Sequence, residues 1–426
     1  MILLKNIRFL ITQNQDREIL ENVDVLIKKD RIFKIGKNLS DHHSPDNVLD
    51  CSNKVVLPGL INTHTHASMT AFRGISDNKL LEDWLQEDIF PAEDSLTEKD
   101  AYYGALAACV EMLKKGTTCF SDMYFHMNQV ADAVEESGMR AILARGLTDI
   151  EEAQDLDEVL DQLVDLVGRD RIKPAIAPHS IYTCSEELLL DSKEIADKFN
   201  LLYHIHLSET QKENEDSMKA RDMTPTEYLD NLGILDENTV AAHGTHLNRE
   251  DIKALAENKV GIAHNPSANL KLGSGIADIP ELRKKGVKIG LGTDGPASNN
   301  NLNLFEEAKV SALLHKREDP RIINEQEILD MMTIEAAEIL GTSHEIGSVE
   351  RAKKADLITI DLDQPEMRPF HGKEGVLSNL IYSFSGNVSD TLVDGKIVVE
   401  NGEMIKTNEK VNLRELQRRS EKFSSD

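Results

Sequence analysis

The central part of the chain alternates short apolar runs with longer amphipathic segments. Helical spacing of apolar residues marks the amphipathic segments, for example over 101–116 and 155–167. Strands alternating with helices predict the α/β class, and here a parallel (β/α)₈ barrel of the TIM type over residues 55–350. The runs that have the length and composition of its eight buried strands are 55–62, 117–123, 140–147, 173–178, 201–207, 239–244, 259–265 and 287–294.

The two ends of the chain have another texture, with short strand-like runs and turns. VDVLIKKDRIFKIG, at 23–36, alternates apolar and polar residues around a Lys-Lys-Asp turn, as a hairpin does. Asp-Gly and Asn-Gly, which are turn dipeptides, interrupt similar runs near the C-terminus. We expect residues 1–54 and 351–410 to pair into one small β-sandwich domain, and the charged residues 411–426 to form a C-terminal helix and tail.

Composition indicates a location and excludes two classes of partner. The 426 residues are 40% hydrophobic and 29% charged, and no apolar run approaches the roughly 18 residues of a membrane span. The first residues lack the layout of a signal peptide, and the four cysteines are scattered without a C-x-x-C pair. The net charge of −27 disfavours nucleic-acid binding, which needs a basic surface. We expect a cytoplasmic protein that binds neither nucleic acid nor membranes.

Histidines and acids gather at the predicted strand ends, where barrels of this type carry their chemistry. Side chains two apart in a strand share a face, so a His-x-His pair presents two imidazoles together. Imidazole and carboxylate ligands suit a catalytic Zn²⁺ site that leaves one position open for water. His179 and His243 end two further strands, and Glu209 follows the ligand His206 by three residues. The predicted ligands are His64, His66, His206 and Asp294.

Two other residues bear on the metal site. His204 shares the inward face of His206, and we expect it to be packed inside the barrel rather than bound to metal. Lys173 begins its predicted strand, so no lysine stands at the end of that strand, where a binuclear barrel hydrolase carries a bridging lysine. One Zn²⁺ per subunit is therefore expected, although the same ligands also bind Fe²⁺ and other divalent ions.

Five segments carry a resemblance that covers nearly the whole chain: PGLINTHTH, HIHLSET, AAHGTHL, AHNPSANLKLGSG and GLGTDGPASNN. Together they resemble the amidohydrolase superfamily, and within it the 5-methylthioadenosine/S-adenosylhomocysteine deaminases and the related 5′-deoxyadenosine deaminases. The resemblance implies zinc-dependent hydrolysis of 5′-deoxyadenosine, 5′-methylthioadenosine, S-adenosylhomocysteine or adenosine to the inosine analogue plus ammonia. It also implies a homo-oligomer, with a tetramer as the expected form.

The implied reaction assigns roles to residues beyond the metal ligands. Glu209 is the expected proton donor to the purine ring nitrogen N1. Asp294 would bind the metal and relay a proton from water to the leaving ammonia, and His243 would orient the attacking water. Glu93 in WLQEDIFPAE, Arg145 and His179 match substrate contacts of the family, with Glu93 as the expected acceptor for the ribose hydroxyls.

One departure from the family pattern bears on the substrate. Some members carry a second arginine about a dozen residues after Arg145, which binds an amino-acid carboxylate. This chain has TDIEEAQDLDE at 148–158, with no arginine. We therefore expect it to prefer uncharged 5′ groups over S-adenosylhomocysteine.

Other functions remain open at this point. The first is another ring hydrolase on the same barrel, acting on guanine, cytosine or a chloro-triazine; Glu93 and Arg145 favour a nucleoside instead. The second is a metal-binding scaffold without activity, which would have no need of Glu209 or His243. Polynucleotide deaminases use a His/Cys/Cys zinc site with P-C-x-x-C, which this sequence lacks.

Overall fold

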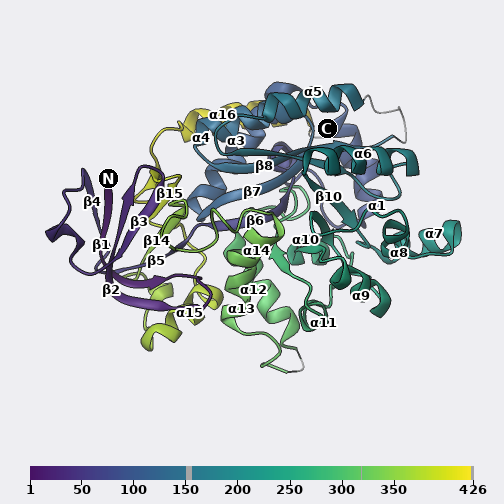
Figure 1. Ribbon diagram of the computed structural model, residues 1–426. Helices are drawn as coiled ribbons and strands as arrows, with labels where there is room; N and C mark the ends of the chain where they lie inside the picture. The colour runs from purple at the N-terminus through teal and green to yellow at the C-terminus, as the bar shows by residue number, and fades with distance from the viewer. Residues whose placement is uncertain (150–155, 318, 424–426) are drawn as a thin grey trace.

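The computed structural model describes residues 1–149, 156–317 and 319–423, which form a barrel and an adjoining sheet (Figure 1). Within these residues the barrel sheet has eight strands, whose order across the sheet follows the chain, and every neighbouring pair is parallel. The predicted fold is confirmed. The strands are β6 (Leu60–Thr65), β7 (Thr117–Tyr124), β8 (Arg140–Leu147), β9 (Ile172–Pro178), β10 (Leu202–Leu207), β11 (Thr239–His243), β12 (Gly261–His264) and β13 (Ile289–Leu291).

The barrel closes where the ends of β6 and β13 approach each other. The backbone N–H of Asp294 donates to the carbonyl oxygen of His64 at 3.0 Å, and the Asn62 side chain donates to Thr293 Oγ1 at 2.8 Å. A Cβ at Gly292 would lie 2.3 Å from the Asn265 side-chain oxygen, so only glycine fits at this position. Closure therefore brings residues of the first and last barrel strands into one site.

Helices cover the outside of the barrel (Figure 1). The predicted helices at 101–116 and 155–167 correspond to α3 and α5, although residue 155 lies outside the described residues. The helices between the strands and after them are α3 (Glu98–Lys114), α4 (Met127–Ser137), α5 (Leu156–Leu166), α6 (Glu186–Phe199), α7 (Gln211–Arg221), α8 (Pro225–Asn231), α9 (Arg249–Glu257), α10 (Pro266–Lys271), α11 (Ile279–Lys284), α12 (Leu304–His315), α13 (Glu325–Met332) and α14 (Ile334–Ile339). No helix in the described ranges is both long and apolar enough to span a bilayer.

The two chain ends form a second, mixed sheet beside the barrel (Figure 1). Its order across the described strands is β17-β16-β15-β14-β5-β1-β2-β3, with β4 on β1, so the expected pairing of the two ends is confirmed. The strands are β1 (Ile2–Ile11), β2 (Ile19–Lys28), β3 (Arg31–Gly36), β4 (Asn47–Asp50), β5 (Lys54–Pro58), β14 (Leu357–Asp361), β15 (Asp390–Val393), β16 (Lys396–Glu400) and β17 (Glu403–Met404). The helix α15 (Gly372–Tyr382) lies between β14 and β15 in sequence.

The prediction of a single barrel strand over 55–62 is wrong. β5 pairs with β1 and β14 in the sheet of the chain ends, and the barrel strand β6 begins only after Gly59. A Cβ at Gly59 would lie 2.1 Å from Thr118 Oγ1, so the chain passes between the sheets where it has no side chain. An apolar run cannot show this switch, because both strands are equally buried. The domain division at residue 54 stays a prediction.

The C-terminal segment is packed against the barrel helices. It consists of α16 (Glu409–Ser420), which lies alongside α3 (Figure 1). Arg419 pairs with Asp100 at 3.3 Å, and the ring of Phe423 contacts Phe72 edge-on with centroids 4.7 Å apart. The helix predicted within 411–426 is therefore present, and residues 424–426 lie outside the described residues.

The barrel interior is packed in its lower part and hollow at the carboxyl ends of the strands. Alternate strand residues such as Ile142 and Ala175 form a buried apolar cluster with Ile339 of α14. A cavity of about 1040 Å³ lies at the carboxyl ends of the strands. Apolar packing in the lower part of the barrel stabilises the fold, and the cavity at the carboxyl ends of the strands leaves space for a ligand.

A candidate metal and catalytic site

Three imidazoles meet at the closed end of the cavity. Ring nitrogens of His64 in β6, of His66 just after β6 and of His206 in β10 lie within 4.8 Å of one another, close enough to hold one ion. Nε2 of His64 is buried without a hydrogen-bond partner among the described residues. A buried nitrogen without a partner is costly unless something binds it, so the donor set fits a metal ion.

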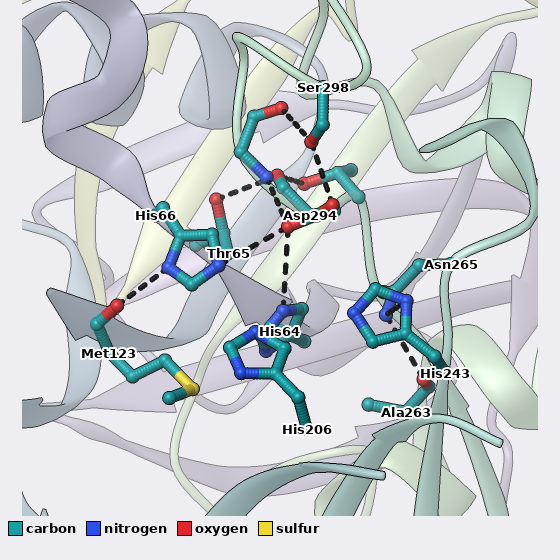
Figure 2. A network of polar contacts seen from close by, with 12 residues as sticks. His64, Thr65, His66, Met123, His206, His243, Ala263, Asn265, Asp294 and Ser298 are labelled. Carbon is teal, nitrogen blue, oxygen red and sulfur yellow. Dashed lines mark hydrogen bonds and ion pairs between the residues drawn. The ribbon is translucent and has the colours of Figure 1, made fainter. Parts of the chain in front are cut away.

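The other ring nitrogen of two of these histidines is held by a backbone carbonyl. Nδ1 of His66 lies 2.6 Å from the Met123 oxygen, and Nδ1 of His206 lies 2.8 Å from the His179 oxygen. An N–H must face a carbonyl, so the neutral form of each ring, which is the form that binds a metal, has its lone pair on Nε2. Hydrogen bonds of this kind orient metal-binding histidines (Figure 2).

His204 is packed inside the barrel, as expected, but it also supports the site. Its Nε2 lies 3.1 Å from Nδ1 of His64, and its Nδ1 lies 3.2 Å from the Ser121 hydroxyl. Burial lowers the pKa of His204 well below its usual value, so the ring is neutral. His204 therefore fixes the orientation of His64, a role that its position in a strand could not reveal.

Asp294 lies beside the histidines at the barrel seam (Figure 2). Its Oδ1 is 3.5 Å from Nε2 of His64 and 3.3 Å from Nε2 of His66. The Gly295 N–H and the Ser298 hydroxyl donate to the same carboxylate, each at 2.7 Å. Burial raises the pKa of Asp294, but the two imidazoles outweigh burial and hold the pKa well below its usual value. Asp294 is thus a fixed carboxylate and stays the predicted fourth ligand.

Three strand ends of the site have left-handed backbone conformations. Ser208 has φ 46°, His243 has φ 74° and Asp294 has φ 60°. This region is uncommon for residues other than glycine and costs free energy, so it persists only where the surroundings enforce it. These three residues lie where the chain leaves its strands for the cavity. Residues with uncommon backbone conformations of this kind cluster at functional sites.

Glu209 and His243 face each other above the histidine cluster. Oε2 of Glu209 lies 3.6 Å from Nε2 of His243, and Oε1 accepts from the Ser274 hydroxyl at 3.0 Å. Asn269 donates to Nδ1 of His243 at 2.8 Å, which leaves the imidazole proton on Nε2. Burial raises the pKa of Glu209 to about 8 and lowers that of His243 to about 4. At neutral pH the acid therefore carries a proton and the imidazole is neutral.

The predicted substrate contacts lie at the wall of the same cavity. Glu93 ends α2 (Phe90–Glu93), and Arg145 comes from β8. Tyr124 donates to Glu93 at 2.5 Å, and burial raises the pKa of Glu93 to about 7. Apart from His64, which lies beneath the cavity, every residue that the sequence nominated lines it: His66, Glu93, Arg145, His179, His206, Glu209, His243 and Asp294.

Sequence reasoning missed Glu213, a buried acid of α7 beneath Glu209. Its two carboxyl oxygens accept the backbone N–H of Ser208 at 3.1 Å and that of Glu209 at 2.7 Å. Burial raises its pKa to about 8. The Thr210-x-x-Glu213 spacing is a helix-capping signal that could have pointed to it. Glu213 holds the segment that carries Glu209.

Comparison with known proteins places the chain among metal-dependent hydrolases. The model of the amidohydrolase family matches residues 55–398. A 5′-deoxyadenosine deaminase of Methanobrevibacter smithii is 46% identical over 88% of each chain. A 5-methylthioadenosine/S-adenosylhomocysteine deaminase of Thermoanaerobacter pseudethanolicus is 40% identical over 95% of this chain and 94% of the relative.

A solved structure extends the likeness to the fold and the metal. The crystal structure of an adenosine deaminase from Xanthomonas campestris, with bound zinc, superposes with a TM-score of 0.94 at 30% identity. The match covers 99% of this chain and 98% of that one.

Proposed function

Because this chain belongs to the amidohydrolase family, we propose that it hydrolytically deaminates adenosines modified at the 5′ position. The products are the inosine analogue and ammonia. One observation carries the proposal: a single cavity joins the histidine cluster and the protonated Glu209 to Glu93 and Arg145. The names of the relatives at 46% and 40% identity support the same substrates.

Zn²⁺ is the metal that we propose for the cluster, one ion per subunit. His64, His66 and His206 would hold it with Asp294, and Nε2 of His64, which is buried without a hydrogen bond among the described residues, supports this assignment. Zinc is present in the adenosine deaminase structure from Xanthomonas campestris, and the same ligand types also accept Fe²⁺. A bound Zn²⁺ lowers the pKa of a water molecule from 15.7 to about 7, which supplies hydroxide at neutral pH.

The residues around the cluster would move the protons of the reaction. Glu209 donates its proton to N1 of the purine as water adds to C6, and Asp294 accepts a proton from that water. Asp294 then passes the proton to the departing amino group, which leaves as ammonia. Glu209 recovers a proton from the C6 hydroxyl as the carbonyl forms, and His243 orients the water throughout.

Ultraviolet absorbance tests the proposal directly, because deamination of adenine to hypoxanthine shifts the spectrum. The zinc-loaded protein would be given 5′-deoxyadenosine, 5′-methylthioadenosine, S-adenosylhomocysteine, adenosine, adenine and guanine in parallel. We expect turnover of the nucleosides and not of the free bases. Turnover of guanine alone, or of none of these compounds, would contradict the proposal and favour another ring hydrolase or a scaffold without activity.

The change Glu93→Gln is expected to separate nucleosides from bases. We propose that Glu93 accepts hydrogen bonds from the ribose hydroxyls, and a bond to a charged acceptor is worth about 1.5–3 kcal/mol. The variant should raise KM for 5′-methylthioadenosine by about tenfold or more, with kcat less affected. Asp94→Asn is the matched control, because Asp94 lines the same wall. An unchanged KM would mean that Glu93 does not bind the ribose.

The change Glu213→Gln is expected to lower kcat with little change in KM. The amide keeps the size of the side chain but provides one acceptor oxygen for two backbone N–H groups, so Glu209 loses its fixed position. Small displacements of an acid can cost about 10- to 100-fold in rate. Glu215→Gln, an exposed acid of the same helix, is the control and should retain full activity. Equal kcat in both variants would show that Glu213 does not position Glu209.

Three further properties also remain proposals. We propose a homo-oligomer, with a tetramer as the expected form, and a cytoplasmic location; the first rests on the family resemblance and the second on the sequence. The small domain is proposed to comprise residues 1–54 and 351–410, the barrel residues 55–350, and the charged C-terminal helix and tail residues 411–426. Sedimentation of the purified protein would test the oligomeric state.

A further inference from the structure

The cavity is lined by one arginine among several acids. Among the described residues that line the cavity, Arg145 is the single lysine or arginine. Five carboxylic acids line the same space: Glu93, Asp94, Glu158, Glu209 and Asp294. Any anionic part of a ligand therefore depends on Arg145 for a charged partner.

Arg145 lies next to the residues proposed to bind ribose. It pairs in register with Tyr124 of the neighbouring strand, and residues in register project to the same face of a sheet. The Tyr124 hydroxyl donates to Glu93. The proposed function places the adenine ring at the histidine cluster and the ribose at Glu93. Because Arg145 lies on the same face as Tyr124, which contacts Glu93, we place the 5′ substituent of an adenosine beside Arg145.

Glu158 already pairs with this arginine. Its Oε1 lies 3.1 Å from Nη1 of Arg145, with the Glu158 side chain 58% exposed and that of Arg145 24% exposed. Glu158 belongs to the first turn of α5, where the helix dipole favours a negative charge. The acid thus sits on the rim and covers the guanidinium from the solvent side.

We propose that Glu158 determines the charge that the enzyme accepts at the 5′ substituent. By pairing with Arg145 it discriminates against anionic groups and leaves neutral groups such as methyl or methylthio unaffected. This inference rests on the proposed deaminase function, and it gives a structural cause for the expected preference for uncharged substituents.

The selection follows from charge competition. An anionic 5′ group must displace the Glu158 carboxylate from Arg145 or share the guanidinium with it, and two like charges then lie close together. A neutral group needs neither rearrangement. A cationic group meets Glu158 favourably, so the order of acceptance is neutral or cationic before anionic.

Three 5′-thio adenosines that differ in the charge of the 5′ group test the proposal: methylthio (neutral), carboxymethylthio (anionic) and aminoethylthio (cationic). The variant Glu158→Gln keeps the shape of the side chain and removes its charge. We expect kcat/KM for the carboxymethylthio compound to rise about five- to tenfold, as for a partly exposed ion pair. The value for methylthioadenosine should stay within about twofold, and that for the aminoethylthio compound should fall.

Two further variants exclude simpler explanations. Asp161→Asn removes the same charge from an exposed position of α5 and should change none of the three values. In the double variant Arg145→Gln with Glu158→Gln, the gain for the anionic compound should disappear. Equal ratios of anionic to neutral turnover in the wild type and Glu158→Gln would overturn the inference. If the wild type turns over none of the three compounds, the proposed function itself fails.

Discussion

Replacing Glu209 with glutamine is expected to lower kcat for 5′-methylthioadenosine by about 10²- to 10⁴-fold, the usual contribution of general acid–base catalysis. Burial raises the pKa of Glu209 to about 8, so the wild-type side chain carries the proton that N1 of the purine must receive. Glutamine fills the same space and keeps an acceptor for the Ser274 hydroxyl. It has no acidic proton to give.

Two measurements separate this chemical loss from structural damage. Metal content should be unchanged, because the histidine cluster does not include Glu209. The affinity of the variant for 5′-methylthioinosine, the product of this reaction, should change by less than about tenfold, because at most one neutral hydrogen bond is altered. A glutamine variant with near-normal kcat would remove Glu209 as the proton donor and point to another acid.

Removal of the metal is expected to lower turnover by about 10³-fold or more, because hydroxide is scarce at neutral pH without a metal-bound water. Treatment with a chelator should abolish activity, and added Zn²⁺ should restore it. Stability should follow metal occupancy. A ligand present at 1,000 times its Kd stabilises a folded protein by about 4 kcal/mol, so Tm should fall when the ion is removed.

Substitution in the cluster should reproduce the effect of the chelator. His206→Ala leaves only His64, His66 and Asp294 to bind the ion, and we expect less than one equivalent of zinc and a Tm that responds only weakly to added metal. His42→Ala, at an exposed position far from β10 in sequence, is the control and should bind normally. Full turnover by metal-free protein would exclude the proposed mechanism and revive a role without metal catalysis.

Much of the site could be predicted because it is built from strand ends. In a parallel barrel the carboxyl ends of all strands meet at one face. Residues that are hundreds of positions apart, such as His64 and Asp294, therefore had to be neighbours once the strands were recognised. In the structure the nominated residues lie around one cavity, with Asp294 3.5 Å from His64. Their chemical roles stay predictions.

Contacts between elements were less predictable, because sequence periodicity describes one element at a time. The chain passes from one sheet to the other at Gly59 because Thr118 leaves no room for a side chain there. His64 is oriented by its contact with His204. Glu209 is held in place by Glu213, which accepts its backbone N–H. The spacing of Glu213 hinted at a helix cap, but not at which backbone groups it would hold.

The sequence by itself determined the barrel, the sheet of the two chain ends and the set of histidines and acids at the cavity. The periodicity of apolar residues and the positions of the strand ends are local properties that can be read along the chain. Tertiary structure alone decided the protonation of Glu209 and the partner of Arg145. Burial sets the first, because the pKa of a carboxyl depends on the solvent that its neighbours exclude. The packing of α5 against α4 and β9 sets the second, placing Glu158 3.1 Å from the guanidinium.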